Sequence, residues 1–407
     1  MSNDTQPEIR FPGFTEAWEQ RKLGDEFEKV NERNDGSFGK DKWISVAKMY
    51  FQDPEKVQSN NIDTRTYVMR LGDIAFEGHP NADFKFGRFV VNDIGEGVVS
   101  ELFPIYRHKQ EYDNNYWKYA IQLERIMAPI FAKSITSSGN SSNKLYPKHF
   151  LRQRVSVASI DEQHKIGDFL LTIDRTITLH QRKLDLLKET KKGFLQKMFP
   201  KNGAKVPEIR FPGFTEAWEE RKLETLFEKG GSGGTPKSTN PDYYRGDIPF
   251  LGISDISNSN GYIKKTEKSI TLEGLNNSAA WVVPKGAISL AMYASVGKLA
   301  ILNIDVATSQ AFYNMVFNDD RLRDFVYQRL SMANDLGEWI KLISTGTQAN
   351  LNADKVKNFV IQLPSNIEEI GKIGSFLNQI DNTIILHQRK LDLLKETKKG
   401  FLQKMFV

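Results

Sequence analysis

The clearest pattern of hydrophobic and polar positions lies in two segments, one in the middle of the chain and one toward its C-terminal end. In each segment, mostly apolar residues recur in alternating steps of four and three over about 35 residues. This alternation is typical of the contact face of a coiled coil, so it predicts two long helices that pack on each other. At 1.5 Å per residue, each helix would be roughly 50 Å long. The pattern positions are Ile166, Leu170, Ile173, Ile177, His180, Leu184, Leu187, Lys191, Phe194 and Met198, and then Ile373, Leu377, Ile380, Ile384, His387, Leu391, Leu394, Lys398, Phe401 and Met405.

Both helical segments begin with a capping box, which is a Ser-x-x-Glu sequence at residues 159–162 and again at residues 365–368. Two histidines, His180 and His387, fall on the contact face. A metal-binding or pH-sensing role is one interpretation of them, and a partly solvated core position is the other. The residues expected at the centre of the helix–helix contact are Ile173, Ile177, Leu184, Leu187, Ile380, Ile384, Leu391 and Leu394.

The chain contains two pairs of repeated segments. Residues 7–23 return as residues 207–223 with one change, Gln20 to Glu220, and residues 165–199 return as residues 372–406 with 30 of 35 positions identical. Between them, residues 31–158 and 231–364 share almost no identity. A repeat near 200 residues excludes a solenoid, whose repeats are far shorter. The order constant–variable–constant, found twice, indicates a molecule that reads two different targets with one scaffold.

Composition narrows the classes of protein further. A length of 407 residues favours two or three domains. Cysteine is absent, which excludes disulfide scaffolds, thiol nucleophiles and cysteine-ligated metal sites. The N-terminal residues lack an apolar signal region and no apolar run is long enough to span a bilayer, so we expect a soluble cytoplasmic protein.

The positive charge is concentrated in the repeated helices. The net charge is +5, and residues 180–199 and 387–406 each carry six Lys or Arg and two Asp or Glu, so that the rest of the chain amounts to 5 − 8 = −3. A solvated helix face is the simplest interpretation of these charges. Because the copies also repeat their outward residues, a second interpretation is a pair of equivalent docking surfaces for identical partner subunits. Recent duplication without functional constraint is the alternative. The outward residues proposed for docking are Gln181, Lys188, Lys192, Gln388, Lys395 and Lys399.

Motifs of known enzymes are incomplete in this sequence. Residues 230–238 (GGSGGTPKS) approach a phosphate-binding loop, but Pro236 stands where that motif needs glycine, and proline lacks an N–H group for phosphate. Residues 240–243 (NPDY) approach the Asn-Pro-Pro-Tyr element of adenine methyltransferases, without a glycine-rich cofactor loop ahead of it. The histidines are scattered, with no H-E-x-x-H spacing for a metal. We therefore predict a chain without catalytic or metal-binding residues.

Loops that combine basic, aromatic and small polar residues occur in both variable regions. Side chains of these types contact DNA phosphates and base edges, although such loops are often only solvated connections. The DNA-binding candidates are Lys85, Arg88, Ser137, Ser138, Asn140, Ser141 and Lys144 in the first region, and Thr235, Lys237, Ser238, Tyr243, Tyr244, Arg245, Tyr293, Ser295, Lys298, Thr345, Thr347, Gln348 and Asn350 in the second.

These features together resemble the specificity subunit of Type I restriction-modification enzymes, over nearly the whole chain. The first variable region lacks the Gly-Gly-Thr-Pro loop that the second carries. The matching segments are the doubled lead-in at residues 10–23 and 210–223, residues 233–256, residues 346–350 (GTQAN), residues 357–364 (KNFVIQLP) and the doubled helices.

The resemblance implies an α+β (mixed α/β) fold with two target-recognition domains in a pseudo-twofold arrangement, joined by two long antiparallel coiled-coil helices. It implies domains at 1–158 (first target recognition), 159–200 (first spacer helix), 201–364 (second target recognition) and 365–407 (second spacer helix). Each recognition domain would read one half of a bipartite, asymmetric site in double-stranded DNA.

The resemblance also implies partners. Two methylase subunits would modify adenine, and two restriction subunits would translocate and cleave DNA in the full complex. S-adenosylmethionine, ATP and magnesium are expected on those partners, with no cofactor in this chain. Two other functions remain open, a two-domain coiled-coil scaffold for protein interactions and a single-chain DNA methyltransferase.

Overall fold

The computed structural model describes residues 6–58, 62, 65–137, 142–201, 203–343 and 351–407. The chain divides into two compact units. The first unit joins Met1–His180 to Lys390–Val407, and the second unit is Gln181–Arg389. Both units mix helices with mainly antiparallel sheets, which confirms the predicted mixed α/β class.

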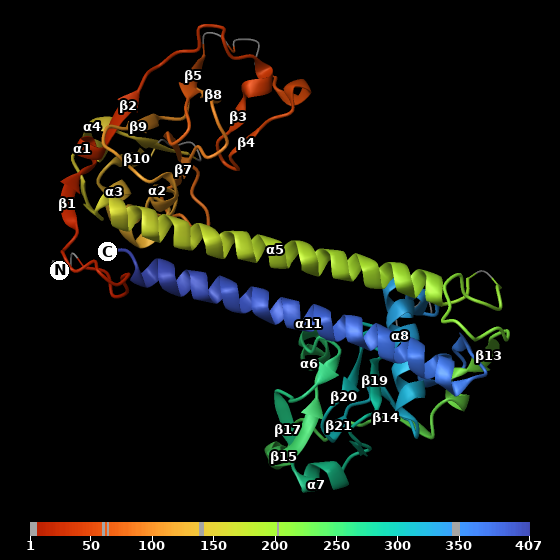
Figure 1. The fold of residues 1–407 in the computed structure, drawn as a ribbon. Helices are drawn as coiled ribbons and strands as arrows, with labels where there is room; N and C mark the ends of the chain where they lie inside the picture. The colour runs from red at the N-terminus through yellow and green to blue at the C-terminus, as the bar shows by residue number, and fades with distance from the viewer. Residues whose placement is uncertain (1–5, 59–61, 63–64, 138–141, 202, 344–350) are drawn as a thin grey trace. The chain divides into compact units, whose positions relative to one another are not determined.

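Two long helices, α5 (Ile160–Met198) and α11 (Ile367–Lys404), correspond to the repeated segments (Figure 1). Each helix contributes one part to each unit. In the first unit Phe169 of α5 meets Phe401 of α11 with ring centroids 4.8 Å apart, and Asp174 pairs with Lys398. Because the partner number falls as the α5 number rises, the two helices run antiparallel there. Phe194 with Phe376 and Lys191 with Asp381 show the same direction in the second unit.

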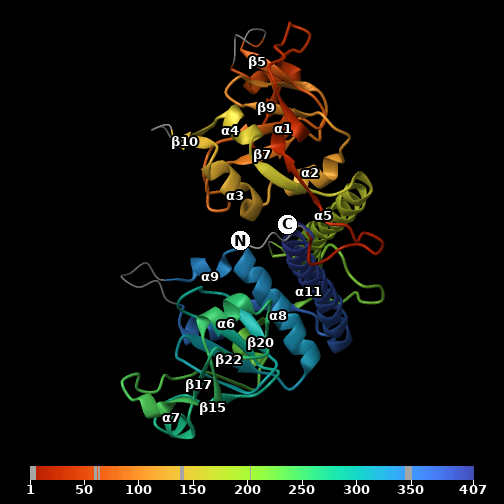
Figure 2. The same cartoon turned by 90° about the vertical axis from the view of Figure 1, so that its left-hand side faces the viewer.

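The first unit contains a four-stranded antiparallel sheet in the order β2-β9-β6-β7, two-stranded ladders and the short helices α1 to α4. Helices α2 and α3 lie between its strands and α5 (Figures 1 and 2). The elements are β1 (Glu19–Lys22), α1 (Leu23–Glu26), β2 (Phe27–Val30), β3 (Ile44–Ser45), β4 (Tyr50–Phe51), β5 (Thr66–Met69), β6 (Ile74–Glu77), β7 (Arg88–Val91), β8 (Gly97–Ser100), β9 (Ile105–His108), α2 (Asn114–Ala120), α3 (Glu124–Ala132), β10 (Ile135–Ser137), β11 (Asn143–Leu145), α4 (Pro147–Leu151) and β12 (Arg154–Val157).

The second unit contains a five-stranded sheet in the order β14-β22-β19-β20-β16 and a four-stranded sheet in the order β17-β15-β21-β18. Its elements are β13 (Glu219–Lys222), β14 (Lys229–Ser232), η4 (Pro241–Tyr243), β15 (Tyr244–Leu251), α6 (Ile253–Asn258), β16 (Tyr262–Ile263), β17 (Lys268–Ile270), α7 (Leu272–Asn276), β18 (Val282–Val283), β19 (Ile288–Ala291), β20 (Leu299–Leu302), β21 (Val306–Thr308), β22 (Phe312–Val316), α8 (Asp320–Asp335), α9 (Glu338–Lys341), α10 (Ala353–Lys357) and β23 (Val360–Leu363).

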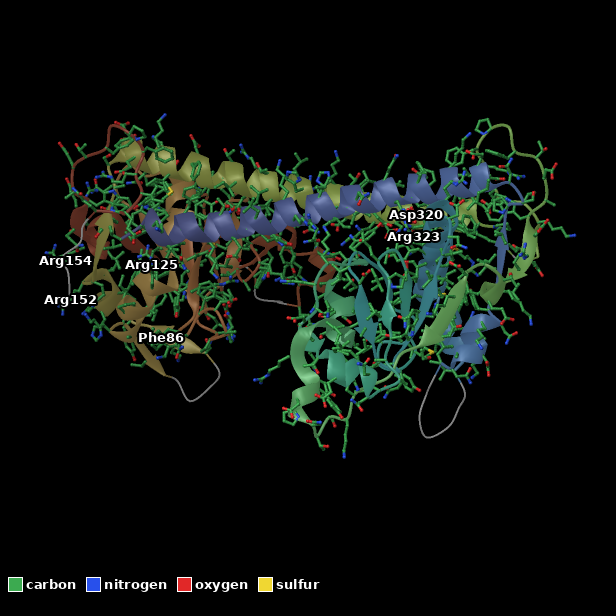
Figure 3. All side chains as sticks on the ribbon, turned by 90° about the horizontal axis from the view of Figure 1, so that it is seen from below. Phe86, Arg125, Arg152, Arg154, Asp320 and Arg323 are labelled. Atoms are coloured by element: carbon green, nitrogen blue, oxygen red, sulfur yellow. The ribbon has the colours of Figure 1, made fainter. Side chains whose placement is uncertain are left out.

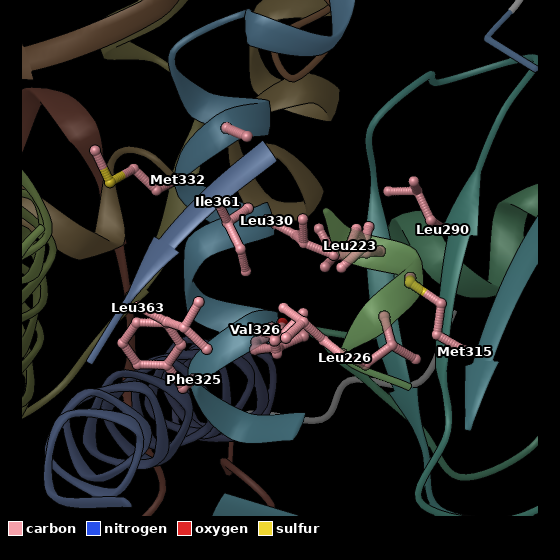
Figure 4. Packing of buried hydrophobic residues seen from close by; sticks show 14 of the residues in the cluster. Leu223, Leu226, Leu290, Met315, Phe325, Val326, Leu330, Met332, Ile361 and Leu363 are labelled. Atoms are coloured by element: carbon pink, nitrogen blue, oxygen red, sulfur yellow. The ribbon is translucent and has the colours of Figure 1, made fainter. Parts of the chain in front are cut away.

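The main core of the second unit forms where α8 packs against the five-stranded sheet and β23 (Figure 4). Phe325 and Leu330 of α8 are fully buried, as is Leu290 of β19. Burying side chains of this size is worth about 1.5–3 kcal/mol each. The packing therefore fixes the sheet against α8, and α8 in turn contacts α11, where Gln328 donates to Asp381 over 2.7 Å.

The repeated lead-in segments, residues 7–23 and 207–223, each join the start of one long helix to the end of the other. In the first unit, Arg10 pairs with Glu162 near the start of α5 at 2.7 Å, and the Ile9 N–H donates to the Lys404 carbonyl near the end of α11. Trp18 is buried beside these contacts. The first copy of the lead-in thus contacts the start of α5 and the end of α11 at once.

The second unit builds the same arrangement from the second copy. Arg210 pairs with Glu369 of α11 at 2.7 Å, and the Ile209 N–H donates to the Lys197 carbonyl of α5 at 2.9 Å. Trp218 is buried there as Trp18 is in the first unit. The lead-ins and helices are therefore repeated together because they are parts of one structural frame, which surrounds a different variable region in each unit.

Candidate nucleic-acid interface

Two segments of the first variable region, far apart in sequence, meet at one place. The connection between β6 and β7 (residues 78–87) contacts the β10–β11 hairpin, where the Asn143 N–H donates to the Gly78 carbonyl at 2.8 Å and the Asn143 amide donates to the Phe86 carbonyl at 3.1 Å. A side chain at Gly78 would place its Cβ 2.2 Å from the Asn143 carbonyl oxygen, so this approach requires glycine. We call residues 78–88 with 135–137 and 142–145 the first loop cluster.

The predicted DNA contacts of the first region lie in this cluster. Lys85 is exposed, with its ammonium 5.2 Å from the centroid of the Phe86 ring, and Lys144 is exposed on β11. Arg88 is half-buried at the start of β7, and its guanidinium donates to the Ala47 carbonyl at 2.5 Å. Ser137 ends β10, whereas Ser138, Asn140 and Ser141 lie outside the described residues. The exposed cations are thus Lys85 and Lys144, while Arg88 is engaged within the fold.

Three connections of the second variable region gather at one edge of the five-stranded sheet. In the strand register, Ser232 at the end of β14 lies opposite Tyr313 near the start of β22, and Ala291 at the end of β19 lies opposite Phe312. The segments that leave these strand ends, residues 233–243, 292–298 and 309–311, therefore share that edge. The Leu351 N–H reaches the same edge and donates to the Met292 carbonyl at 3.1 Å. We call these segments, with residues 244–245, the second loop cluster.

The residues predicted to bind DNA in this cluster are mostly exposed. Thr235, Lys237, Ser238, Tyr293, Ser295 and Lys298 all lie on the surface. Ser295 has a left-handed backbone, with φ of 59°. Outside the described residues lie Thr345, Thr347, Gln348 and Asn350.

One member of the second loop cluster was missed by sequence reasoning. The Thr235 hydroxyl donates to the Gln310 amide oxygen at 2.7 Å. Gln310 is exposed and lies 75 residues along the chain from Thr235, in a segment with no recognisable motif. Gln310 could be assigned to this cluster only from the pairing of β14 with β22, which brings it to Thr235.

The glycines before Thr235 have a packing role. A Cβ on Gly233 would lie 1.8 Å from the Thr308 carbonyl oxygen, and one on Gly234 would lie 2.7 Å from Ala279 backbone atoms. The loop is followed by a three-residue 3₁₀ helix, η4, rather than by the long helix that a phosphate-binding loop precedes. The glycines are thus explained by close backbone approach.

Tyr243, Tyr244 and Arg245 connect the second loop cluster to β15. The Tyr244 hydroxyl donates to the Pro236 carbonyl at 2.7 Å, which ties the start of β15 to the Thr235 loop. Tyr243 is half-buried, and Arg245 is exposed with φ of 63°, beside an irregularity in the β15–β17 register. Non-glycine residues with positive φ are uncommon, and bulged strands often re-aim a side chain near functional sites.

The predicted helix-contact residues are all at least half-buried. Leu184 and Leu391 are each 1% exposed, and Ile173, Ile177, Leu187, Ile380, Ile384 and Leu394 are half-buried. The pattern positions Lys191 and Lys398 form ion pairs with Asp381 and Asp174, respectively, both at 2.6 Å. Sequence reasoning missed these two aspartates, although each repeated segment carries one of them at the same position, as it does the lysine.

The predicted docking residues lie along the outward faces of the helices. Lys188, Lys192, Lys395 and Lys399 are exposed, and Gln181 and Gln388 are half-buried. Each helix also exposes two leucines that lie seven residues apart and hence on one face. Leu179 and Leu186 of α5 are 66% and 67% exposed, and Leu386 and Leu393 of α11 are 63% and 67% exposed.

The structure adds two negative findings for its described residues. Among them, no group of three or more histidine, aspartate or glutamate side chains is arranged to hold a metal ion. In that same part of the chain, no helix is both long and apolar enough to cross a bilayer.

The known proteins that this chain resembles are consistent with one another. Residues 215–396 match the model of the Type I restriction modification DNA specificity domain. The chain is 29% identical to the MjaIX Type I restriction enzyme specificity subunit of Methanocaldococcus jannaschii over 192 residues, which are 47% of this chain and 44% of that protein. A match to the putative MjaX specificity subunit of the same organism is 22% identical and covers 95% of this chain and 92% of the relative. The first of these relatives is thus matched over less than half of its length.

Solved structures agree on the fold. The S subunit of a Type I restriction-modification system from M. genitalium superposes with a TM-score of 0.62 at 12% identity, covering 99% of both chains. A chain from a structure of the type I R-M system gives a TM-score of 0.52 at 18% identity, covering 98% of this chain and 99% of that one. At these identities the likeness concerns the fold, and together with the matched domain it confirms the resemblance found in the sequence.

Proposed function

We propose that this chain is the DNA-recognition subunit of a Type I restriction-modification complex, which the match of residues 215–396 to the model of the Type I restriction modification DNA specificity domain supports. The observation that carries this proposal is the gathering of exposed polar, aromatic and basic loops within each unit, inside two nearly identical frames. Each unit would read one half of a bipartite, asymmetric site. The constant frame holds the loops and the variable region sets the sequence that is read.

Within each loop cluster, the side-chain chemistry favours phosphate contacts for some residues and base contacts for others. Lys85 and Lys144 in the first cluster, and Lys237 and Lys298 in the second, would contact phosphates, which supplies affinity without sequence information. Exposed hydroxyl and amide groups, such as those of Thr235 and Gln310, suit base edges. The Thr235–Gln310 hydrogen bond would hold both side chains in one orientation before DNA arrives.

We propose two methylase subunits as direct partners, docked on the outward faces of α5 and α11. The exposed leucines support this surface, because each is among the residues that recur in both helices and none is needed for the contact between them. Identical docking surfaces suit identical partners. Two restriction subunits would join in the full cytoplasmic complex, and S-adenosylmethionine, ATP and magnesium would be held by the partners, leaving this chain non-catalytic.

An exchange of one variable region tests the proposal. Residues 231–364 would be replaced by the variable region of another family member, and the chimera would be expressed with its methylase partners. Methylated adenines would then be mapped in genomic DNA. We expect one half of the methylated site to change and the other half to remain. A chimera that alters both halves would contradict recognition by independent units, and absence of any site-specific methylation with the unchanged chain would contradict the function itself.

Two other functions make different predictions. A protein-interaction scaffold would not bind DNA in a salt-dependent manner, whereas phosphate contacts make DNA affinity fall steeply with salt. A single-chain methyltransferase would bind S-adenosylmethionine on its own, which equilibrium dialysis of the purified chain with the labelled cofactor measures directly.

A further inference from the structure

A groove of about 650 Å³ in the first unit runs beside strands β1 and β12 and has a strongly positive lining. Lys133, Arg152 and Arg154 line it, and all three are exposed. Figure 3 labels Arg152 and Arg154, which lie close together at the edge of this unit. The remaining described residues of the lining are apolar or neutral and include no aspartate or glutamate. We call this the β1–β12 groove.

The strand register adds a fourth cation to the same face. Lys22 of β1 lies directly opposite Arg154 of β12, and Gln20 lies opposite Ser156. Residues that face each other across an antiparallel pair point to the same side of the sheet. The Gln20 amide donates to the Ser156 hydroxyl at 2.6 Å, and the Arg154 guanidinium donates to the Gln20 carbonyl at 3.0 Å, so neither of these contacts brings a carboxylate to the cations.

The second unit builds the same strand pair without this charge. There Lys222 lies opposite Val360, Glu220 lies opposite Gln362, and the Lys222 ammonium donates to the Asn358 side-chain oxygen at 2.8 Å. The one residue that differs between the repeated lead-ins, Gln20 against Glu220, therefore falls on this face. At the matched positions of this strand pair, the first unit carries Gln20, Lys22 and Arg154 where the second carries Glu220, Lys222 and Val360.

The β1–β12 groove and the first loop cluster are joined through the chain at Lys133. Lys133 is the C-cap of α3, and the next residue, Ser134, accepts a backbone hydrogen bond from Tyr146 at 2.8 Å. Strand β10 begins at Ile135, and its partner β11 carries Lys144. Lys133 of the groove therefore lies two residues before the first loop cluster.

We propose that the β1–β12 groove binds the sugar-phosphate backbone of the duplex that flanks the first half-site, an inference that rests on the proposed function. A cationic channel without carboxylates suits a regularly spaced polyanion, and arginine pairs with phosphate through two parallel hydrogen bonds. An acidic protein surface is the other candidate ligand. DNA is favoured because Lys133 of the groove lies two residues before a loop cluster already proposed to contact DNA. The consequence is that DNA outside the recognised sequence strengthens binding on one side only.

The test uses the full chain with its methylase subunits and three duplexes that contain the methylated site. One duplex has long flanks on both sides, one is trimmed next to the first half-site, and one is trimmed next to the second. The variant Arg152→Gln/Arg154→Gln removes two charges, and Arg152→Lys/Arg154→Lys is the matched control that keeps them. Affinity is measured over a range of salt concentrations.

We expect the unchanged complex to lose roughly tenfold in affinity when the first flank is trimmed, and the glutamine variant to lose the same amount with the long duplex. The slope of log affinity against log salt should become shallower by about two, since each phosphate contact contributes about 0.9. Trimming should weaken the glutamine variant much less than the unchanged chain, and the lysine variant, which keeps both charges, should keep the salt slope of the unchanged chain.

Two results would overturn the proposal while leaving DNA recognition intact. One is equal sensitivity of the unchanged complex to both flanks. The other is a glutamine variant that binds all duplexes normally but no longer retains its protein partners, which would assign the groove to an acidic protein. If the unchanged complex shows no preference for DNA containing the site, the proposed function itself fails.

Discussion

The buried ion pairs at the starts of α5 and α11 allow a comparison within one molecule. Glu369 is 1% exposed and accepts two hydrogen bonds from Arg210, at 2.7 and 2.8 Å. Glu162 is equally buried and is paired in the same way with Arg10. The difference lies in the neighbouring tryptophan, which in the first unit also donates its indole N–H to Glu162, at 2.9 Å.

Trp218, the corresponding tryptophan of the second unit, has a buried indole N–H without a hydrogen-bond partner among the described residues. Arg210→Leu would therefore leave Glu369 buried without its ion-pair partner, which costs about 3–5 kcal/mol. Arg10→Leu leaves Glu162 with one donor, and a hydrogen bond to a charged group is worth about 1.5–3 kcal/mol. Arg10 also donates to the exposed Glu16 carbonyl at 2.6 Å, whose loss offsets part of that advantage. The net difference should be on the order of 1 kcal/mol.

Calorimetry and urea denaturation of the two single variants measure this difference. We expect Arg210→Leu to lower the melting temperature by roughly 10 °C, and Arg10→Leu to lower it by several degrees less. The double variant Arg210→Leu/Glu369→Leu serves as the control, because replacing a buried pair by apolar residues restores most of the stability. Equal destabilisation by the two single variants, or the reverse order, would refute the assignment of the extra hydrogen bond to Glu162.

Three further predictions concern pH, packing and chemistry. Burial lowers the pKa of His108 from 6.5 to about 3, so protonation favours the unfolded chain. Stability should therefore fall as the pH drops from about 6.5 toward 3, by up to about 1.4 kcal/mol per pH unit. His108→Phe, which keeps the stacking on Tyr112, should flatten this pH dependence in urea denaturation, and an unchanged slope would contradict the prediction. Gly233→Ala should destabilise the second unit by about 1–3 kcal/mol because its Cβ meets the Thr308 carbonyl, whereas Gly231→Ala, with nothing within 4 Å, should be tolerated in the same melting assay. The purified chain should neither methylate nor cleave DNA without partners, and methyl transfer from labelled S-adenosylmethionine would disprove this.

The long helices could be predicted from sequence because their signals are local. The 3–4 alternation depends on residues within one or two turns, and the buried Leu184 and Leu391 lie on the predicted contact face. The predicted cap of the second helix was wrong by one residue, because α11 begins at Ile367 and the Asn366 side chain accepts the Glu368 N–H. The repeats also revealed that lead-in and helix belong together. The contacts between lead-in and helix, such as the ion pair of Arg10 with Glu162, could not be predicted from the sequence.

The loop clusters could be only half predicted. Residue types identified the candidate loops, but their meeting depends on strand pairing between distant segments, which no local pattern encodes. Gln310 joined Thr235 through the β14–β22 register, and Gly233 proved to be a packing residue beside Thr308. Arg152 and Arg154 were not predicted as binding residues because they belong to no motif. Their place beside Lys22 follows only from the pairing of β12 with β1.

The closing of the first unit by residues 390–407 has a consequence for the order of events during synthesis. Met405 and Phe406 are buried in the core of this unit, beside Trp18 and Tyr116. The second unit is one continuous stretch, Gln181–Arg389, and can fold as soon as it leaves the ribosome. The first unit must wait for its last segment, about 10 to 45 s at the usual 5–20 residues per second. During that interval its aromatic core stays partly uncovered, so a chain that ended soon after Arg389 would have a complete second unit and a first unit that exposes apolar surface to chaperones and proteases.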